Sequence, residues 1–363
     1  MRRRYSYGYG AYHGRSRFRT FLKVLIVLLV VVLLFAVAAV LLLDRYWVYD
    51  RDGARLEIPF LHPQQDTQPP DQTQQGGLVL VSPSPSVPAE PSYLRAVLLP
   101  RTALYDGTAQ QQVTAAGANA AIFDMKADDG TLAYISNVDL ARSIGSSASD
   151  PALNAAIESL CDGELYTIAR VSCFRDNTAP YQNNSLSIKT YSGYNWRDAG
   201  NIRWMSPTNE QARQYVVDVC VELAQLGFDE ILLDYSAYPT DGKLQNIKTG
   251  SSYDASAFST VVGGFYSQVR TALAAYPQVR LSIVTDADTV TNGSNASSGQ
   301  TTQMLSQVAD RIWVAPAEGA SWETYTGPLS ALGMDPVAGI VSISTQAGTS
   351  QQSWAVISQE QES

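Results

Sequence analysis

The sequence has few histidines and no glycine-rich phosphate loop. Its two histidines, His13 and His62, both precede the part of the chain whose pattern indicates a folded domain. A Ser-His-Asp triad and histidine-ligated metal sites are therefore excluded for that domain. Neither of the common nucleotide-binding glycine motifs occurs between a strand and a helix, and Asp128 and Asp129 lack the spacing of a calcium loop. We therefore expect no metal and no cofactor.

Acidic residues are absent from the first 23 positions. That segment carries seven of the 25 basic residues, and the rest of the chain has 18 basic residues against 34 acidic ones, a balance of −16. An acidic domain repels phosphate groups, so nucleic-acid binding is disfavoured. The basic residues of the tail are Arg2, Arg3, Arg4, Arg15, Arg17, Arg19 and Lys23.

An uninterrupted apolar stretch of 20 residues, 24–43, follows the basic tail. At about 1.5 Å per residue it is long enough to span a bilayer as a helix. The basic cluster before it predicts a single-pass membrane protein with residues 1–23 in the cytoplasm and the chain after Asp44 outside.

A cleaved signal peptide is the alternative for this stretch, but it would have a shorter apolar core of roughly 7–15 residues. Ala36-Val37-Ala38 is followed by further apolar residues, which favours a retained signal-anchor. The tail either contacts anionic lipid headgroups or serves only as a disordered topology signal.

Residues 44–92 lack a composition that could bury a core. Gln alternates with Pro from 63 to 75, and a Ser-Pro repeat follows at 82–86. Such a composition favours extended, polyproline-like chain, so we predict a disordered spacer that holds residues 93–363 away from the membrane.

Cysteine is scarce, with three residues at positions 161, 173 and 220. In an exported chain this odd number permits at most one intramolecular disulfide and leaves one free thiol. Cys173 follows a predicted strand and Cys220 lies on or near the apolar face of a predicted helix. We therefore favour their interpretation as small core residues.

Residues 226–239 contain the most informative pattern of the chain. Ile231 to Leu233 form a short apolar run between Gly227 and Asp234, which is typical of a strand buried on both faces in a parallel sheet. Ser206-Pro207 provides an N-cap and a first-turn proline for a helix ahead of it. The carboxyl ends of barrel strands hold active sites, so Asp234 is placed for chemistry.

At these residues the chain resembles a known family. The segment Gly-Phe-Asp-Glu-Ile at 227–231, with Asp234, Tyr235 and Pro239, together with the upstream segment 121–130, resembles the glycoside hydrolase-like domain of bacterial membrane-anchored surface proteins, long catalogued as a domain of unknown function. The resemblance runs from about 93 to about 343 and implies a (β/α)8 TIM barrel.

The alternation of elements in residues 93–363 fits that α/β fold, whose typical length is ~250 residues. Only 353–358 is left for an eighth strand, so the barrel is short, open or closed by that hexapeptide. Predicted helices lie at 109–116, 151–160, 209–226, 255–276, 301–309 and 321–332. Predicted strands lie at 96–99, 120–124, 167–171, 230–234, 280–285, 311–314 and 337–341.

Carboxylates at strand ends are the chemical resource that remains. Glycoside hydrolysis needs two carboxyl groups, one ionised and one that donates a proton. Asp234 is the first candidate, as nucleophile or as the carboxylate that stabilises positive charge on the sugar. Asp286 is the acid/base candidate by position. The family's segment after the sixth strand has lost its tyrosine here, so Glu318 is the alternative acid. Glu230, four residues before Asp234, is placed at the bottom of the barrel and interpreted as structural.

Further residues are candidates for substrate binding. Asp124, Lys126 and Asp128 alternate on one side of an extended segment, and the resemblance implies that Asp124 orients a sugar hydroxyl and that Lys126 tunes Asp234. A solvated turn is the competing interpretation. Aromatic rings pack on sugar faces, and the candidates are Trp196, Trp204, Tyr235 and Tyr238.

These patterns predict a membrane-anchored, outward-facing glycosidase that cleaves cell-envelope or environmental polysaccharide. The altered segment after the sixth strand and the short C-terminus leave a second possibility open. In that alternative the barrel binds a glycan, or mediates cell-surface interaction, without cleaving it.

Overall fold

The computed structural model describes residues 47–50, 53–56 and 92–357. The chain divides into two compact units, Met1–Leu80 and Val81–Ser363. The predicted cytoplasmic tail 1–23 and membrane span 24–43, and most of the predicted spacer, lie outside the described residues. Within the described ranges, no helix is both long and apolar enough to cross a bilayer.

The first unit contains a hairpin that the sequence analysis did not predict. Strands β1 (Trp47–Asp50) and β2 (Gly53–Leu56) pair antiparallel, with Asp50 opposite Gly53. The predicted spacer therefore contains at least this short ordered element.

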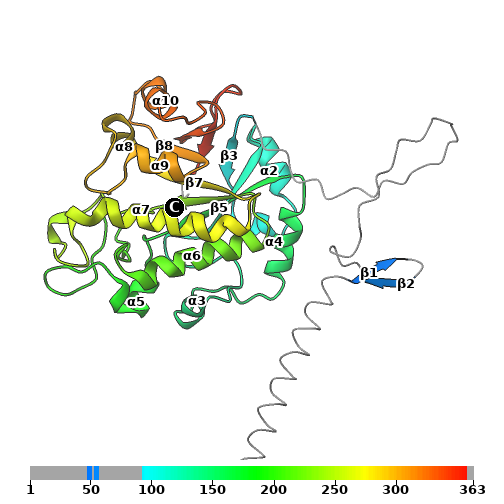
Figure 1. Cartoon of the computed structure of the whole chain (residues 1–363), viewed down its shortest axis with the longest axis horizontal. Helices are drawn as coiled ribbons and strands as arrows, with labels where there is room; N and C mark the ends of the chain where they lie inside the picture. Colours follow the sequence, from blue (N-terminus) through cyan, green and yellow to red (C-terminus); the bar gives the residue numbers. More distant parts are fainter. Residues whose placement is uncertain (1–46, 51–52, 57–91, 358–363) are drawn as a thin grey trace, which may run out of the picture. The chain divides into compact units, whose positions relative to one another are not determined.

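The second unit is a closed barrel of eight parallel strands in the order β10-β3-β4-β5-β6-β7-β8-β9 (Figure 1). Its strands are β3 (Arg95–Leu98), β4 (Ala120–Lys126), β5 (Tyr166–Ser172), β6 (Glu230–Asp234), β7 (Arg280–Asp286), β8 (Arg311–Ala315), β9 (Ile340–Ser344) and β10 (Trp354–Val356). The predicted TIM barrel is confirmed.

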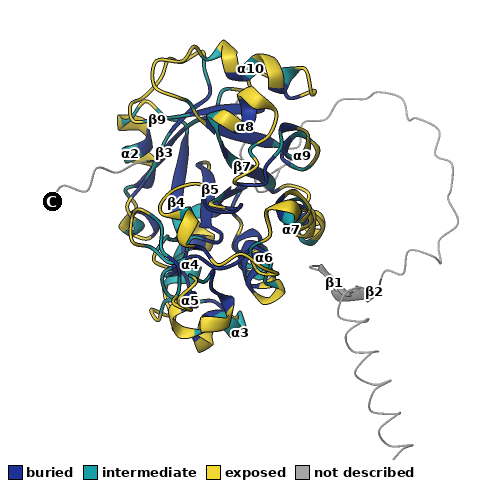
Figure 2. Cartoon of the chain, turned by 90° about the vertical axis from the view of Figure 1, so that its left-hand side faces the viewer, coloured by how far each residue is buried: buried dark blue, intermediate teal, exposed yellow. Residues whose placement is uncertain are grey.

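Helices surround this barrel with their buried faces turned toward the strands (Figure 2). The α-helices are α2 (Ala109–Ala115), α3 (Asp139–Ser143), α4 (Leu153–Cys161), α5 (Ala179–Gln182), α6 (Glu210–Gln225), α7 (Phe258–Ala272), α8 (Ala287–Asn292), α9 (Thr302–Val308) and α10 (Glu323–Ser330). Shorter 3-10 turns are η1 (Arg101–Leu104), η2 (Asn184–Leu186), η3 (Leu244–Asn246), η4 (Ala255–Ala257) and η5 (Leu273–Ala275).

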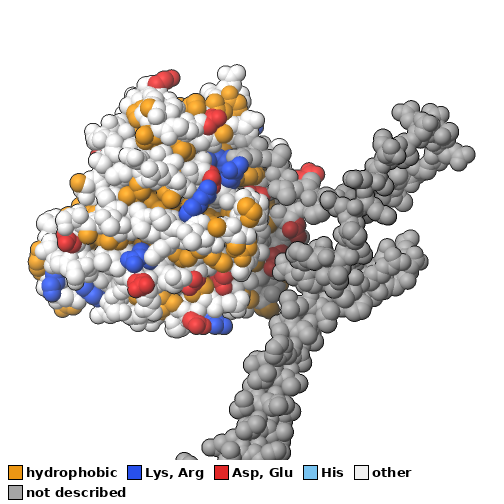
Figure 3. Space-filling model, in the orientation of Figure 1, with side chains coloured by type: hydrophobic (Ala, Val, Ile, Leu, Met, Phe, Trp, Pro, Cys, Tyr) orange, Lys and Arg blue, Asp and Glu red, His pale blue; other side chains and the backbone are white. Residues whose placement is uncertain are grey.

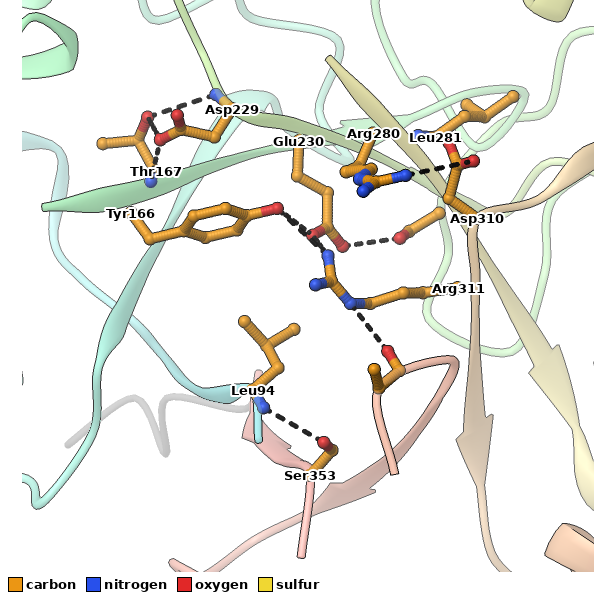
Figure 4. Close-up of polar contacts among 12 residues, drawn as sticks. Leu94, Tyr166, Thr167, Asp229, Glu230, Arg280, Leu281, Asp310, Arg311 and Ser353 are labelled. Carbon is orange, nitrogen blue, oxygen red and sulfur yellow. Dashed lines mark hydrogen bonds and ion pairs between the residues drawn. The ribbon is translucent and has the colours of Figure 1, made fainter. Parts of the chain in front are cut away.

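The eighth strand, left open by the sequence, closes the barrel with three residues. Trp354 to Val356 pair with β9 on one side and with β3 on the other. The Ser353 hydroxyl also accepts a hydrogen bond from the Leu94 amide at 3.0 Å (Figure 4). The seventh strand begins three residues later than predicted, because Asp335 accepts hydrogen bonds from the Val337 and Ala338 amides and holds that segment in a turn.

The unit that carries Asp234 differs from prediction at its helix start. The N-cap of α6 is Asn209, whose side chain accepts the Ala212 amide, and Ser206-Pro207 lies just upstream. Gly227 then reverses the chain with a φ of +94°, a conformation that L residues adopt at a cost. The turn places β6 in register between β5 and β7, so Asp234 ends a strand that is paired on both sides.

The bottom of the barrel is closed by a buried polar network (Figure 4). Glu230 is fully buried and its carboxylate binds Arg311, while the Tyr166 hydroxyl donates to the same carboxylate at 3.0 Å. Ser282 donates to its other oxygen. Glu230 is therefore structural, as predicted, because every one of these contacts lies below the layer that carries Asp234.

The barrel unit keeps its apolar side chains largely inside. All three cysteines are buried and free, which confirms their interpretation as small core residues and gives no disulfide in the described part of the chain. On the face shown in Figure 3, hydrophobic side chains form only small groups among polar and charged ones.

Candidate active site

A cavity of about 810 Å³ opens at the carboxyl ends of the barrel strands. Residues at or just beyond the carboxyl ends of β4, β5, β6 and β7 supply much of its polar wall, because parallel strands end at one face of the barrel. Six carboxyl groups line it, against two guanidinium groups, Arg170 and Arg175. The six acids are Asp124, Asp128, Asp198, Asp234, Asp241 and Asp286.

Arg170 is the centre of the cavity floor and binds three of these acids. Its Nε lies 2.8 Å from Asp234 Oδ2 and its Nη1 lies 2.6 Å from Asp124 Oδ1. Its Nη2 lies 3.1 Å from Asp128 Oδ1 and 2.6 Å from Asp234 Oδ2. Strand register explains the arrangement, since Asp124 lies opposite Arg170 on β4 and Asp234 lies on β6 two positions beyond Arg170.

Electrostatics keeps Arg170 charged although it is almost completely buried. Burial by itself lowers the pKa of a guanidinium, but the neighbouring Asp234, Asp124 and Asp128 outweigh burial and raise the pKa of Arg170 well above its usual range. The guanidinium is therefore a permanent positive charge under three carboxylates.

Arg175 extends the same network toward the long loop after β5. It binds Asp128 through Nη1, and its Nε lies 2.6 Å from Asp198 Oδ2. Trp204 Nε1 donates to the same Asp198 oxygen at 2.9 Å. Burial alone would raise the pKa of Asp198, but these hydrogen bonds outweigh it and lower that pKa.

Asp286 has a different environment from the acids on Arg170 and Arg175. One of its oxygens accepts the Thr289 amide at 2.7 Å, which caps α8, and the other accepts Asn295 Nδ2 at 2.9 Å. Within the described residues, no cationic side chain is paired with Asp286. It is thus a carboxyl group of the cavity without a compensating positive charge.

Tyr235 follows Asp234 in a left-handed conformation, with a φ of +47°. Such a backbone is costly for a residue with a bulky side chain and is typical of functional sites. Its ring is held by Arg175, whose Cζ lies 4.9 Å from the ring centroid, and by the edge of Trp204 at 5.8 Å. Burial and then Asp234 raise the pKa of Tyr235 to about 12, so the phenol stays neutral.

Seven of the ten predicted site residues line this cavity. They are Asp124, Asp128, Trp204, Asp234, Tyr235, Tyr238 and Asp286. Tyr238 contributes little exposed surface, because its ring stacks on Phe258 with 3.7 Å between centroids.

The other three predicted residues are not brought to the cavity. Lys126 is fully buried, with its ammonium 2.7 Å from Asp176 Oδ2 and bonded to the Ser172 carbonyl, so the expectation that it acts on Asp234 is wrong. Trp196 is buried and donates to the Lys243 carbonyl at 3.0 Å. Glu318 is exposed in the loop after β8, outside the cavity lining.

None of Arg170, Arg175 and Asp198 was among the site residues predicted from the sequence. A guanidinium near the carboxyl end of a strand between two acid-bearing strands is the signal that could have identified Arg170, because the ends of neighbouring parallel strands meet at one face of the barrel. Arg175 and Asp198 lie in a long loop, where residue spacing does not fix proximity. In the described ranges, no group of three or more His, Cys, Asp or Glu side chains is placed to hold a metal ion.

The fold and the cavity define a (β/α)8 barrel with a carboxylate-rich pocket at the carboxyl ends of its strands. Residues 107–316 match the family described as "Putative glycosyl hydrolase domain". The match spans more than half of the chain, so the chain belongs to that family. A search of curated protein sequences finds no match.

Solved structures of glycoside hydrolases share the barrel. The PgaB (BpsB) glycoside hydrolase domain from Bordetella bronchiseptica is 13% identical over 74% of this chain and 94% of its own, with a TM-score of 0.52. Alpha-L-fucosidase isoenzyme 2 from Paenibacillus thiaminolyticus is 12% identical over 73% of this chain and 46% of its own, with a TM-score of 0.50. A hypothetical protein from Ruminiclostridium thermocellum ATCC 27405 is 28% identical over 52% of this chain and 96% of its own, with a TM-score of 0.44.

Proposed function

We propose that the barrel hydrolyses glycosidic bonds in a cell-envelope or environmental polysaccharide, with Asp234 and Asp286 as its carboxyl pair. One observation carries this proposal. The two acids end neighbouring strands, β6 and β7, and line the same cavity beside exposed aromatic surface. Two carboxyl groups on either side of a bound sugar are what glycoside hydrolysis requires.

Asp234 is the carboxylate that acts on the sugar. The Arg170 guanidinium stabilises its negative charge and fixes its Oδ2, while Oδ1 accepts only the Tyr235 amide, at 2.8 Å, among the described residues. In a retaining reaction Asp234 attacks the anomeric carbon, and in an inverting reaction it takes a proton from the attacking water.

Asp286 is the proton donor and acceptor for the leaving oxygen. Among the described residues it has hydrogen-bond donors but no guanidinium against it, unlike Asp234. Its contacts with the Thr289 amide and Asn295 hold the carboxyl group in one orientation. That orientation aims it into the cavity that Asp234 also lines, where it would act on the leaving oxygen.

Rings position the sugar between these acids. Tyr235 is 38% exposed in the cavity and Trp204 stands edge-on against it. Sugar rings have apolar faces that pack on aromatic side chains, and the neighbouring carboxylates accept hydrogen bonds from hydroxyl groups. Asp124 and Asp128 have that second role, since both are held in place by Arg170.

A barrel that binds a glycan without cleaving it is the second candidate. The observation that favours it is the pairing of four of the cavity acids, Asp124, Asp128, Asp198 and Asp234, with Arg170 and Arg175. A network of this kind is suited to a rigid recognition surface as well as to catalysis.

The proposed location is the outer face of the cell membrane, with residues 24–43 as the anchor and residues 1–23 in the cytoplasm. Its support is the sequence alone, namely the 20-residue apolar stretch behind a basic tail. Protease added to intact cells should remove the barrel and leave the tail protected. A barrel that is released into the medium without the tail would contradict the anchor and support a cleaved signal peptide.

The experiment for the enzymatic proposal measures sugar release and glycan binding together. A panel of polysaccharides that includes bacterial cell wall is incubated with the wild type and with Asp234→Asn, which keeps the shape of the side chain. Hydrolysis is supported if the wild type releases reducing sugar and the variant binds the same glycan without releasing it. Binding by both forms with no release from any polysaccharide supports the non-catalytic barrel.

A further inference from the structure

Three strongly exposed tyrosines lie in the segment between β5 and α6. Tyr181, Tyr191 and Tyr194 are 65%, 64% and 76% exposed, and none of them lines the cavity. Rings so exposed are not needed for the core, and a loop that carries several of them is typical of a surface that binds something.

Five cationic side chains belong to the same loop layer. Within the described residues, none of them has a carboxylate within salt-bridge distance, as is also true of Arg101 and Arg213, which bind uncharged groups. We call these five cations and the three tyrosines the basic tyrosine surface. The cations are Lys189, Arg197, Arg203, Lys243 and Lys248.

Backbone contacts join one half of this surface into a single layer. The Lys248 amide donates to the Lys189 carbonyl at 2.7 Å, and the Tyr191 amide donates to the Asn246 carbonyl at 3.3 Å. Trp196 Nε1 donates to the Lys243 carbonyl and so ties the loop after β6 to the loop after β5. The backbone segments that carry Lys189, Lys243 and Lys248 are therefore joined to one another.

The other half is joined through Arg203. Its guanidinium lies 4.8 Å from the centroid of the Tyr181 ring, and Arg203 and Arg197 face each other in an antiparallel bridge. Burial and then the charge of Arg197 lower the pKa of Arg203, as expected for two like charges without an acid between them. The positive field is thus uncompensated at this point.

Few acids border the surface. Asp198 follows Arg197 but is paired with Arg175, and Asp241 lies two residues before Lys243 and lines the cavity. Glu210 begins α6 close to Asn209, whose side chain reaches the Ser185 carbonyl. In a chain with a net charge of −9, a surface where cations outnumber acids is a local inversion of sign.

We propose that the basic tyrosine surface binds an anionic polysaccharide and holds the protein on it. Rings of exposed tyrosines pack on sugar faces, and the five cations neutralise phosphate or carboxylate groups along the strand. The cavity has six carboxyl groups against two guanidinium groups, so it repels the same strand. The surface is therefore an anchoring site distinct from the cavity, and it does not depend on the proposed hydrolysis.

The test uses the full-length protein in phosphatidylcholine nanodiscs. Dissociation constants are measured for polygalacturonate, poly(glycerol phosphate) and neutral dextran, and phosphatidylglycerol vesicles serve as an anionic lipid. One variant carries Arg197→Gln, Lys243→Gln and Lys248→Gln. A matched control variant removes the same charge elsewhere in the barrel, through Arg101→Gln, Arg142→Gln and Arg280→Gln. Both variants keep the basic tail intact.

We expect the surface variant to bind at least one polyanion about 10-fold more weakly than the control, from three exposed charge pairs. Whether polygalacturonate or poly(glycerol phosphate) is preferred identifies the anionic group. A second variant, Tyr191→Ser with Tyr194→Ser, should weaken polysaccharide binding and leave vesicle binding unchanged.

Three outcomes would overturn the proposal. The first is equal polyanion binding by the surface variant and its control. The second is dextran binding as tight as polyanion binding, which would indicate a neutral glycan site. The third is vesicle binding that the surface variant loses while neither polysaccharide binds, which would assign the surface to a membrane.

Discussion

Arg170 contacts Asp234 through two nitrogen atoms that converge on one oxygen, with Nε at 2.8 Å and Nη2 at 2.6 Å from Oδ2. The remaining Nη1 binds Asp124. One side chain therefore fixes acids from two other strands. The carboxylates of the cavity floor are held in one arrangement by Arg170 and are not independent of one another. Arg170 is a positioning residue in this account, since it acts on the sugar through Asp234.

Replacing Arg170 with Gln should damage both the fold and the site. It would leave three carboxylates together on the cavity floor without their charge partner, at a cost of ~3–5 kcal/mol in the free energy of unfolding. Urea unfolding measures the loss, and Arg203→Gln is the control, because Arg203 has no carboxylate partner among the described residues. A loss below ~1 kcal/mol for Arg170→Gln would show that the network is not what holds the floor.

The Glu230–Arg311 pair at the barrel bottom should behave as a buried ion pair. Glu230→Leu leaves the Arg311 guanidinium buried without its carboxylate and should cost ~3–5 kcal/mol. Adding Arg311→Met should recover most of that loss, because two apolar side chains of similar size can replace a buried pair. If the double variant is as unstable as Glu230→Leu, contacts other than the ion pair account for the effect.

Substitution of Gly130 by alanine should cost more stability than the same substitution at a glycine with a similar φ and open space around it. It has a φ of +87°, and an added Cβ would lie 2.8 Å from Asp176 Cγ, next to the buried Lys126 pair. Gly130→Ala should therefore cost ~3 kcal/mol or more, through the backbone and the displaced acid.

Gly117→Ala is the matched control for Gly130→Ala. Its φ is +67° and nothing lies within 4 Å of an added Cβ, so we expect only the backbone cost of ~1–2 kcal/mol. Equal losses in the two variants, measured by thermal unfolding, would show that the contact with Asp176 does not matter.

Stability should fall at acid pH through Asp198. Its folded pKa is lowered, so its contribution is fully present above the unfolded value of about 3.9 and is lost as pH falls through the folded pKa. The pKa of Asp310 is lowered too, because hydrogen bonds from Arg270 and the Leu281 amide outweigh the effect of its burial. We expect Asp198→Asn to flatten the acid limb of a plot of unfolding free energy against pH.

Asp139→Asn is the control for that pH profile. Asp139 pairs with Arg142 on the surface and is 98% exposed, so its pair contributes little to stability. If Asp139→Asn flattens the acid limb as much as Asp198→Asn does, the Arg175–Asp198 pair has no specific role in the pH dependence.

The strands and the barrel could be predicted from sequence because buried strands between helices leave a strong apolar pattern. Residues 230–234 match β6 at both ends, and the position of Asp234 at the cavity followed from its place after that apolar run. The short β10 was harder, since three residues carry almost no pattern and depend on pairing with β9 and β3.

Side-chain partners in the cavity could be predicted less well. Lys126, Asp128 and Asp124 alternate in sequence, but a register shift in β4 between Asp124 and Lys126 changes the level at which each side chain lies. Lys126 consequently pairs with Asp176 inside the barrel wall. Long-range pairs such as Arg175 with Asp198 depend on how the loop folds, which residue spacing does not encode.

The central claim is that Asp234 and Asp286 divide the work of one glycosidic cleavage. Its most direct measurement compares Asp234→Asn, Asp286→Asn and the exposed neighbour Asp288→Asn on a cleavable polysaccharide and on an aryl glycoside of the same sugar, whose leaving group needs no protonation. We predict that Asp234→Asn loses both activities, that Asp286→Asn loses only the polysaccharide, and that Asp288→Asn keeps both. Retention of polysaccharide cleavage by Asp234→Asn, or no cleavage by the wild type, would contradict the account.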